Sequence, residues 1–203
     1  MNIKENKSDF INIMLDFKNE IVDNLNKNIY ANDIDKLRSG YEGKFGKERF
    51  KEYLVKKTAL HIIFKYIFIR MMSEGGKLVS PVNPKFNNEG IANWNEMTKN
   101  YRGDYLMLFE IACEDLRRNE ETNEFFEPCI YDNYIDRLEY SVFNKQGDNY
   151  LEKLMPFNFR TLDSNMAVSL FDNLYPGEDR ENLQVFLEDS KVTTYLMKSL
   201  GLL

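Results

Sequence analysis

The sequence predicts an all-α fold, an irregular multi-helix bundle around a buried central helix at about residues 48–73. In that stretch apolar residues recur at intervals of three and four, and from Ile62 onward they occupy every face of the helix. No run of alternating apolar and polar residues is long enough to require a sheet. A helix that is apolar on all sides must be surrounded, and the surrounding material is other amphipathic helices. We therefore expect Phe64, Ile67 and Phe68 to be fully buried.

The segments before the central helix predict one long helix and one short one. Ser8 is suited to cap the first, as a helix N-cap with a side-chain oxygen. The apolar residues of this helix keep helical spacing and define one buried face: Phe10, Ile13, Met14, Phe17, Ile21 and Leu25. Residues 32–37 favour a short helical turn, and three glycines within residues 40–46 then break the chain. Gly75 and Gly76 predict the end of the central helix.

The second half of the chain predicts shorter helices after an irregular connection. Residues 77–91 are rich in proline, asparagine and glycine and show little periodicity, which is typical of such a connection. The helices expected downstream lie at about residues 92–100, 105–118, 131–142, 150–155, 166–174, 183–187 and 190–200. Asp148 and Asp163 are expected to cap two of them.

Length and composition favour a single helical domain at 1–203, and two lobes joined by the connection at 77–91 are the alternative. The 203 residues are 43% hydrophobic and 14% aromatic, which is enough for a core filled largely by rings. The amino terminus lacks the apolar stretch of a signal peptide. The apolar run at 59–72 is too short to cross a bilayer and is interrupted by Lys65 and Arg70. We expect a cytoplasmic protein that does not contact a membrane.

Charge is unevenly distributed along the chain. Residues 1–100 carry 17 Lys and Arg against 13 Asp and Glu, whereas residues 101–203 carry 10 against 20. A basic part and an acidic part suit nucleic acid, or an acidic partner, on one side only. Clustered cations are enough to neutralise phosphates, and the densest cluster lies at 36–57. The candidate nucleic-acid-binding residues are Lys44, Lys47, Arg49, Lys51, Lys56 and Lys57. A solvated basic face without a ligand is the alternative.

The chain shows no recognisable catalytic, cofactor-binding or metal-binding motif. A methyl donor or nucleotide would need a glycine-rich turn between a strand and a helix, and none occurs. Cys113, Cys129 and the single histidine, His61, are too few for a Cys/His metal site, so we expect buried free thiols and a hydrogen-bonded core histidine. Glu110 and Glu114 stand one helical turn apart, but di-iron helices pair such residues with histidines, so a solvated acidic face is expected.

One further pattern lies in the central stretch, at residues 53–64 and 68–78. There an apolar helix ends in the step Phe68-Ile69-Arg70, followed by an acidic residue, two glycines and a leucine. This pattern resembles a passage in the helical amino-terminal region of adenine-specific DNA methyltransferases of single-chain restriction-modification and related phage-defence systems. Residues 162–174 and 183–202 are similar to the short helices that lead from that region to the catalytic domain.

The resemblance implies a non-catalytic helical module that assists DNA binding or the binding of a methyltransferase catalytic domain or subunit. It carries over no catalytic residue and no cofactor, because the donor-binding and catalytic motifs of the family are absent from the chain. Any DNA contact would be non-specific and made to the backbone. The alternative is a free-standing helical interaction protein that docks a basic partner through its acidic second half. A third hypothesis, an unrecognised enzyme, depends only on carboxylates: Glu110, Glu114, Asp132 and Asp136.

Overall fold

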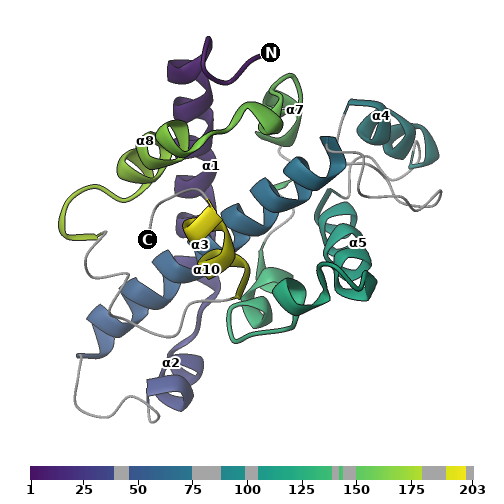
Figure 1. The fold of residues 1–203 in the computed structure, drawn as a ribbon. Coiled ribbons are helices and arrows are strands. Elements are labelled where there is room, and N and C mark those ends of the chain that lie inside the picture. Colours follow the sequence, from purple (N-terminus) through teal and green to yellow (C-terminus); the bar gives the residue numbers. More distant parts are fainter. Residues whose placement is uncertain are drawn as a thin grey trace.

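The fold is an all-α bundle built around one long helix, α3 (Lys47–Glu74), as Figure 1 shows. The computed structural model describes residues 1–38, 46–74, 88–98, 105–138, 142–143, 150–179 and 191–199. Within these ranges the regular elements are helices, without a strand, and an isolated β-bridge joins Asn2 to Asn158. The predicted fold class is therefore confirmed. None of the described helices is both long and apolar enough to cross a membrane.

Eight α-helices and three 3₁₀ helices are described, in the following order along the chain. They are α1 (Lys7–Asn28), α2 (Ala31–Arg38), α3 (Lys47–Glu74), α4 (Asn88–Met97), α5 (Tyr105–Arg118), η2 (Asn123–Phe126), η3 (Asp132–Arg137), α7 (Tyr150–Leu154), η4 (Phe159–Thr161), α8 (Ser164–Leu174) and α10 (Lys191–Ser199).

Helix α3 crosses the middle of the molecule and is covered by elements from the whole described chain (Figure 1). Helices α1, α2, α5 and α10 and the 3₁₀ helices η3 and η4 all contact it. Every residue from Lys57 to Arg70 is buried, which is the burial on all faces that the sequence predicts. The exposed fractions of Phe64, Ile67 and Phe68 are 3%, 1% and 5%, which confirms the expectation for these three residues.

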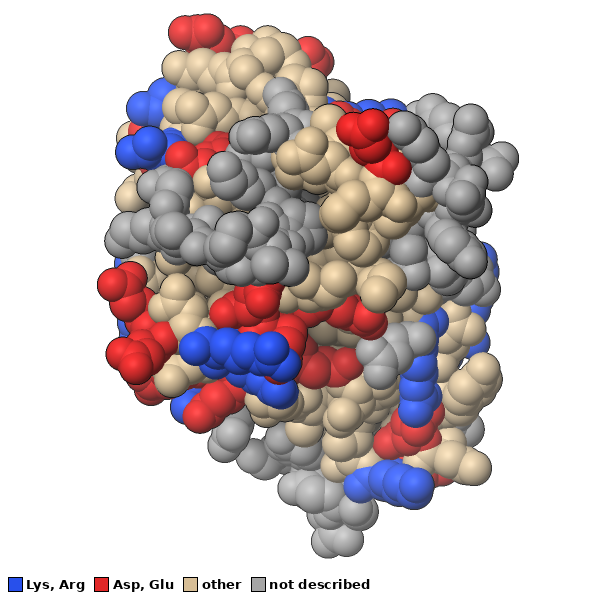
Figure 2. Space-filling model, turned by 90° about the vertical axis from the view of Figure 1, so that its right-hand side faces the viewer, with Lys and Arg blue, Asp and Glu red and all other residues tan. Residues whose placement is uncertain are grey.

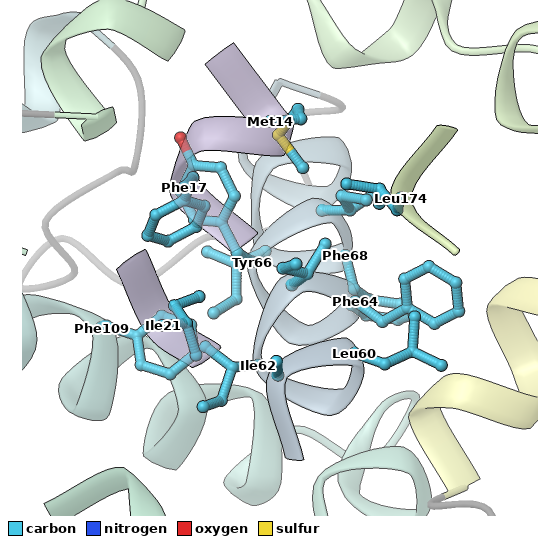
Figure 3. Close-up of a cluster of buried hydrophobic side chains, with 14 of the residues drawn as sticks. Met14, Phe17, Ile21, Leu60, Ile62, Phe64, Tyr66, Phe68, Phe109 and Leu174 are labelled. Atoms are coloured by element: carbon cyan, nitrogen blue, oxygen red, sulfur yellow. The ribbon is translucent and has the colours of Figure 1, made fainter. Parts of the chain in front are cut away.

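Aromatic rings link α1 to α3 in the core. Figure 3 shows Phe17 and Ile21 of α1 beside Tyr66 and Ile62 of α3. The rings of Phe17 and Tyr66 meet edge to face, with 5.8 Å between their centroids. Such edge-to-face contacts add about 0.5–1.5 kcal/mol to the free energy gained by burying the area. The amphipathic face of α1 is thus fixed in register against the central helix.

The last turn of α3 contains a buried arginine that joins it to the chain after α7. Arg70 is 1% exposed, and its Nη1 donates to the carbonyl oxygen of Leu154 at 3.1 Å. Its Nη2 donates to the carbonyl oxygen of Phe157 at 2.8 Å and to Glu74 Oε1 at 2.6 Å. The guanidinium carbon lies 4.4 Å from the ring centroid of Phe159. One side chain therefore bonds the last carbonyl group of α7 and a carbonyl group three residues beyond it.

The amino-terminal residues pack on the same segment after α7. The backbone N–H of Asn158 donates to the carbonyl oxygen of Met1 at 2.9 Å, and the N–H of Ile3 donates to Thr161 Oγ1 at 3.0 Å. Ile3 is fully buried. The beginning of α1 and the end of α3 are therefore held by one short stretch of chain.

Several predicted boundaries and caps need correction. Helix α1 begins at Lys7, with Asn6 in the N-cap position, so the predicted cap at Ser8 is wrong. Helix α4 begins at Asn88 instead of residue 92, because Ile91 and Trp94, three residues apart, are both buried and must share one helical face. The predicted cap at Asp163 is confirmed: its side chain accepts a hydrogen bond from the N–H at the third position of α8.

One further prediction is wrong in the type of helix, and three others concern residues that the structure does not describe. The segment predicted as a helix at 131–142 contains the 3₁₀ helix η3, because Asp132 makes tertiary contacts that fix its start (below). The cap at Asp148, the helix at 183–187 and most of the connection at 77–91 lie outside the described residues.

Replacing Phe64 by alanine should lower the free energy of unfolding by about 3–5 kcal/mol, as truncation of a buried phenylalanine usually does. The ring packs against that of Phe171, with 6.4 Å between centroids. Urea denaturation measures the change. Met97→Ala is the control, since Met97 is 69% exposed and its replacement should change stability by less than about 0.5 kcal/mol. Equal effects of the two substitutions would contradict the central position of α3.

Candidate functional site

Three of the predicted nucleic-acid-binding residues line one shallow groove between α1 and the start of α3. The groove has a volume of about 600 Å³, and Arg49, Lys51 and Lys56 form part of its lining together with Glu48 and Glu52. We call it the basic groove. Its cations lie on the first three turns of α3. Arg49 and Lys56, seven residues apart, share one side of the helix, and Lys51 reaches the groove from a different side.

The cations at the start of α3 are engaged within the protein. Lys47 Nζ lies 2.8 Å from Asp35 Oδ2, and both side chains are exposed. Lys51 Nζ donates at 3.0 Å to the carbonyl oxygen of Asn26, in the last turn of α1, where the helix dipole favours a cation. Exposed ion pairs of this kind contribute about 0.2–1 kcal/mol. A phosphate can therefore replace these partners at small cost.

The other predicted cations differ in how accessible they are to a nucleic acid. Arg49 Nε donates to Tyr53 Oη at 3.2 Å, and its guanidinium lies over the tyrosine ring. Lys56 bridges Glu52 and Asp179, at 2.7 and 2.6 Å from their carboxylate oxygens. Lys57 is only 3% exposed, so its assignment to the nucleic-acid surface is wrong: it faces the interior because the helix is buried on that side as well. Lys44 lies outside the described residues.

A second group of polar side chains lies inside the bundle, between α3 and η3. Asp132 Oδ1 accepts hydrogen bonds from His61 Nε2 at 3.0 Å and from Lys65 Nζ. Asp132 Oδ2 accepts the backbone N–H of Cys129 at 2.8 Å. The Cys129 Sγ atom lies 3.9 Å from His61 Nε2. We call these four residues the buried polar cluster. The expectation of a hydrogen-bonded core histidine is confirmed.

Burial controls the protonation of the cluster. Desolvation lowers the pKa of His61 from its usual 6.5, although the hydrogen bond to Asp132 opposes this. Burial raises the pKa of Asp132, but the hydrogen bonds and charges of His61 and Lys65 outweigh it and hold that pKa well below the usual 3.8. Burial also raises the pKa of the Cys129 thiol to about 11. The histidine and the thiol are thus neutral at pH 7 and the carboxylate is ionised.

The cluster is not arranged as a nucleophilic triad. In a triad one imidazole nitrogen faces the nucleophile and the other is held by the carboxylate. Here the Cys129 Sγ atom and the Asp132 carboxylate both face Nε2 of His61. A thiol whose pKa is about 11 also gives little thiolate at neutral pH. The geometry therefore does not support covalent catalysis by Cys129.

The donor atoms of the cluster do have the composition of a metal site. His61, Cys129 and Asp132 offer one nitrogen, one sulfur and one oxygen, all within 4.8 Å of one another. The sequence predicts no metal site, because its two cysteines and one histidine are too few for a Cys/His site and Glu110 and Glu114 have no histidine at the spacing of a di-iron helix. Residues 61 and 132 are separated by 71 positions, so no spacing in the sequence could have brought them together.

A small pocket and an acidic face adjoin the cluster. The pocket, of about 170 Å³, is bordered by Lys65 and Asp132 at one end and by Cys113, Glu110 and Glu114 of α5. Burial raises the pKa of the Cys113 thiol to about 12, and neither cysteine forms a disulfide. The carboxylates of the acidic face are exposed or half-buried: Glu110, Glu114, Asp115, Glu120, Glu121, Glu124 and Glu127.

The acidic face carries a few cations among its carboxylates. Figure 2 views the molecule from the side on which α5 lies in Figure 1 and shows acidic side chains gathered around a small basic group. Glu114 pairs with Arg117 at 2.9 Å and with Arg118 at 3.0 Å, and Lys191 pairs with Glu127 at 2.6 Å. The sequence predicts a solvated acidic face here, and the structure adds that Glu114, whose side chain is 35% exposed, is paired with two arginines of its own helix.

Comparisons with protein-family models, with curated proteins and with solved structures found no match to this chain.

Stability should fall as the pH decreases below about 6.5, because His61 is the only histidine and its pKa is lowered in the folded state. The unfolded chain then binds a proton that the folded chain resists, which costs up to about 1.4 kcal/mol per pH unit. Urea denaturation between pH 7.5 and 5 measures this slope. Comparison with His61→Gln isolates it, since that variant should show a flatter profile. Identical slopes for parent and variant would contradict the assignment to His61.

Proposed function

We propose that this chain is a non-catalytic, cytoplasmic helical module that holds DNA, or the catalytic domain or subunit of a DNA methyltransferase of the restriction-modification or phage-defence type. The single observation that carries the proposal is the position of the Phe68-Ile69-Arg70 step. These residues are buried at the end of α3, and Arg70 joins that helix to the chain after α7. The likeness to the methyltransferase region thus concerns residues that build a helical core, which favours a scaffold over an active site.

The chemistry of the described polar residues also favours a non-catalytic role. The Cys129 thiol has a raised pKa and is not paired with His61 as in a triad. The carboxylates at Glu114 and Asp132 are engaged by cations on the same chain. Free cysteines are typical of proteins in a reducing cytoplasm.

Because the module is proposed to be non-catalytic, the purified chain should transfer no methyl group when it is supplied with a methyl donor and DNA.

The basic groove is the surface that would contact DNA. Lys51 in the groove and Lys47 beside it are held by weak partners that phosphates can replace, and both lie on a rigid helix. Flexible lysines follow a backbone but do not fix base edges, so binding would be non-specific. The Asp and Glu residues beside them, such as Glu48 and Glu52, would keep the affinity in the weak range, about 10⁻⁴–10⁻⁶ M.

A salt titration of duplex DNA binding tests the groove. Changing Lys47, Arg49 and Lys51 to Gln should weaken binding and reduce the slope of log affinity against log salt by about 0.9 for each phosphate that the variant no longer neutralises. The matched control changes Arg117, Arg118 and Lys191 to Gln. It removes the same charge from the acidic face, where DNA is repelled, and should leave the slope unchanged.

A second candidate function is a free-standing interaction protein that docks a basic partner through the acidic second half. The observation that favours it is the acidic face, on which the carboxylates outnumber the cations. Equal DNA affinities and slopes for parent and both triple variants would remove the basic groove from consideration. If the chain then bound a lysine-rich peptide in a salt-dependent manner, the second function would replace the first. Methyl transfer by the purified chain would overturn both.

A further inference from the structure

The buried polar cluster places three different metal-binding atoms at the corners of a small triangle. His61 Nε2 and Asp132 Oδ1 are 3.0 Å apart, and Cys129 Sγ is 3.9 Å from the same nitrogen. In a tetrahedral zinc site, with bonds of about 2.0–2.1 Å to N and O and about 2.3 Å to S, neighbouring ligands stand about 3.3 Å (N to O) and about 3.6 Å (S to N) apart. The N-to-O edge is thus about 0.3 Å too short and the S-to-N edge about 0.3 Å too long for the ion. The third edge, from Cys129 Sγ to Asp132 Oδ1, is no longer than 4.8 Å.

Several groups around the triangle suit a zinc site, although Lys65 does not. The backbone N–H of Cys129 donates to Asp132 Oδ2, which orients the carboxylate and leaves Oδ1 directed at the imidazole. Such outer contacts fix ligands before the metal arrives. His61 is 1% exposed and lies on the rigid central helix. Of the three donors, Asp132 borders the pocket of about 170 Å³, so an ion would approach the cluster from its carboxylate side.

Lys65 is the group that competes with the metal. Its ammonium bonds the same Asp132 oxygen and supplies the positive charge there. An ion at the triangle would share Asp132 Oδ1 with this ammonium, and the two cations would repel each other. The imidazole would carry its hydrogen on Nδ1 and the Cys129 thiol would release its proton on binding, because thiolate and neutral imidazole are the ligand forms.

We propose that His61, Cys129 and Asp132 form a binding site for a divalent zinc-type ion that joins α3 to the start of η3. The site is independent of the proposed DNA or partner binding, because it involves none of the residues of the basic groove. Since the unfolded chain lacks this arrangement, the ion would stabilise the fold, by about 2.7 kcal/mol at a free concentration 100 times the Kd.

Titration of the metal-free full chain with Zn²⁺ and with Co²⁺ tests the site. Calorimetry gives the affinity for Zn²⁺, and the Co²⁺ absorption spectrum reports both a thiolate ligand and tetrahedral geometry. The decisive pair is Cys129→Ser against Cys113→Ser, because Cys113 is the other free thiol near the cluster but is not one of the three donors. Circular dichroism checks that each variant is folded, and Cys129→Ala replaces the serine variant if it is not.

The parent and Cys113→Ser should bind a single Zn²⁺ with equal affinity and show the thiolate-to-cobalt charge-transfer band. Cys129→Ser should lose the band and bind more than about tenfold more weakly, since outer-shell changes alone cost about 10- to 100-fold. Loss of the band in Cys113→Ser, or no Zn²⁺ binding by the parent beyond that of Cys129→Ser, would overturn the proposal.

Replacing Lys65 by Met locates the ion within the cluster. Removal of the competing ammonium should tighten Zn²⁺ binding if the ion shares Asp132 Oδ1 with it. An unchanged or weaker affinity in a folded Lys65→Met variant would overturn the assignment of Asp132 as a ligand.

Discussion

The buried guanidinium of Arg70 is the interaction on which the rest of the structure depends. A guanidinium removed from water loses several kcal/mol of solvation, which an opposite charge and hydrogen bonds to its N–H groups must offset. In Arg70 the two Nη groups have such partners, whereas the buried Nε has none among the described residues. Glu74 supplies the opposite charge, and carbonyl groups after α7 accept the hydrogen bonds. Because the amino-terminal residues pack on that same stretch, through Asn158 and Thr161, the ends of α1 and α3 meet at one point.

The polar residues within the apolar run of α3 specify how the helix is packed. An all-apolar helix could rotate or slide among its neighbours at small cost, whereas a buried polar group that loses its partner costs about 1–3 kcal/mol, and more if charged. His61 and Lys65 meet Asp132, and Arg70 meets the segment after α7. These interactions occur near the middle and at the end of the helix. Together they fix its rotation and its register, which hydrophobic burial alone leaves loosely determined.

Much of the fold could be predicted because the information is local. The interval of three and four between apolar residues places the central helix at 48–73, and the structure has it at Lys47–Glu74. The carboxylate at Asp163 caps α8 because an N-cap acts on the very next turn. In contrast, the 3₁₀ helix η3 begins where Asp132 is held by α3, and an interaction made across 71 positions does not affect the local periodicity of the sequence.

The candidate sites were harder to predict, because they too depend on contacts between residues far apart in the sequence. Charge density along the sequence indicated the start of α3, where Arg49 and Lys51 line the basic groove. Charge density could not show that Lys57 faces inward, because a helix that is buried on every side has no exposed polar face from which the orientation of its lysines could be inferred. The triangle of His61, Cys129 and Asp132 is created entirely by the packing of η3 on α3, so composition and spacing give no sign of it.

The most direct test of this account is the free energy of unfolding of Arg70→Met, measured by urea denaturation. Removing the guanidinium takes away the buried charge that pairs with Glu74 and the donors that bond the carbonyl groups after α7, and the account predicts a decrease of about 3–5 kcal/mol. Arg118→Met is the matched control, since the Arg118 side chain is 74% exposed and its replacement should change stability by less than about 0.5 kcal/mol. An Arg70→Met variant as stable as this control would contradict the central role of Arg70.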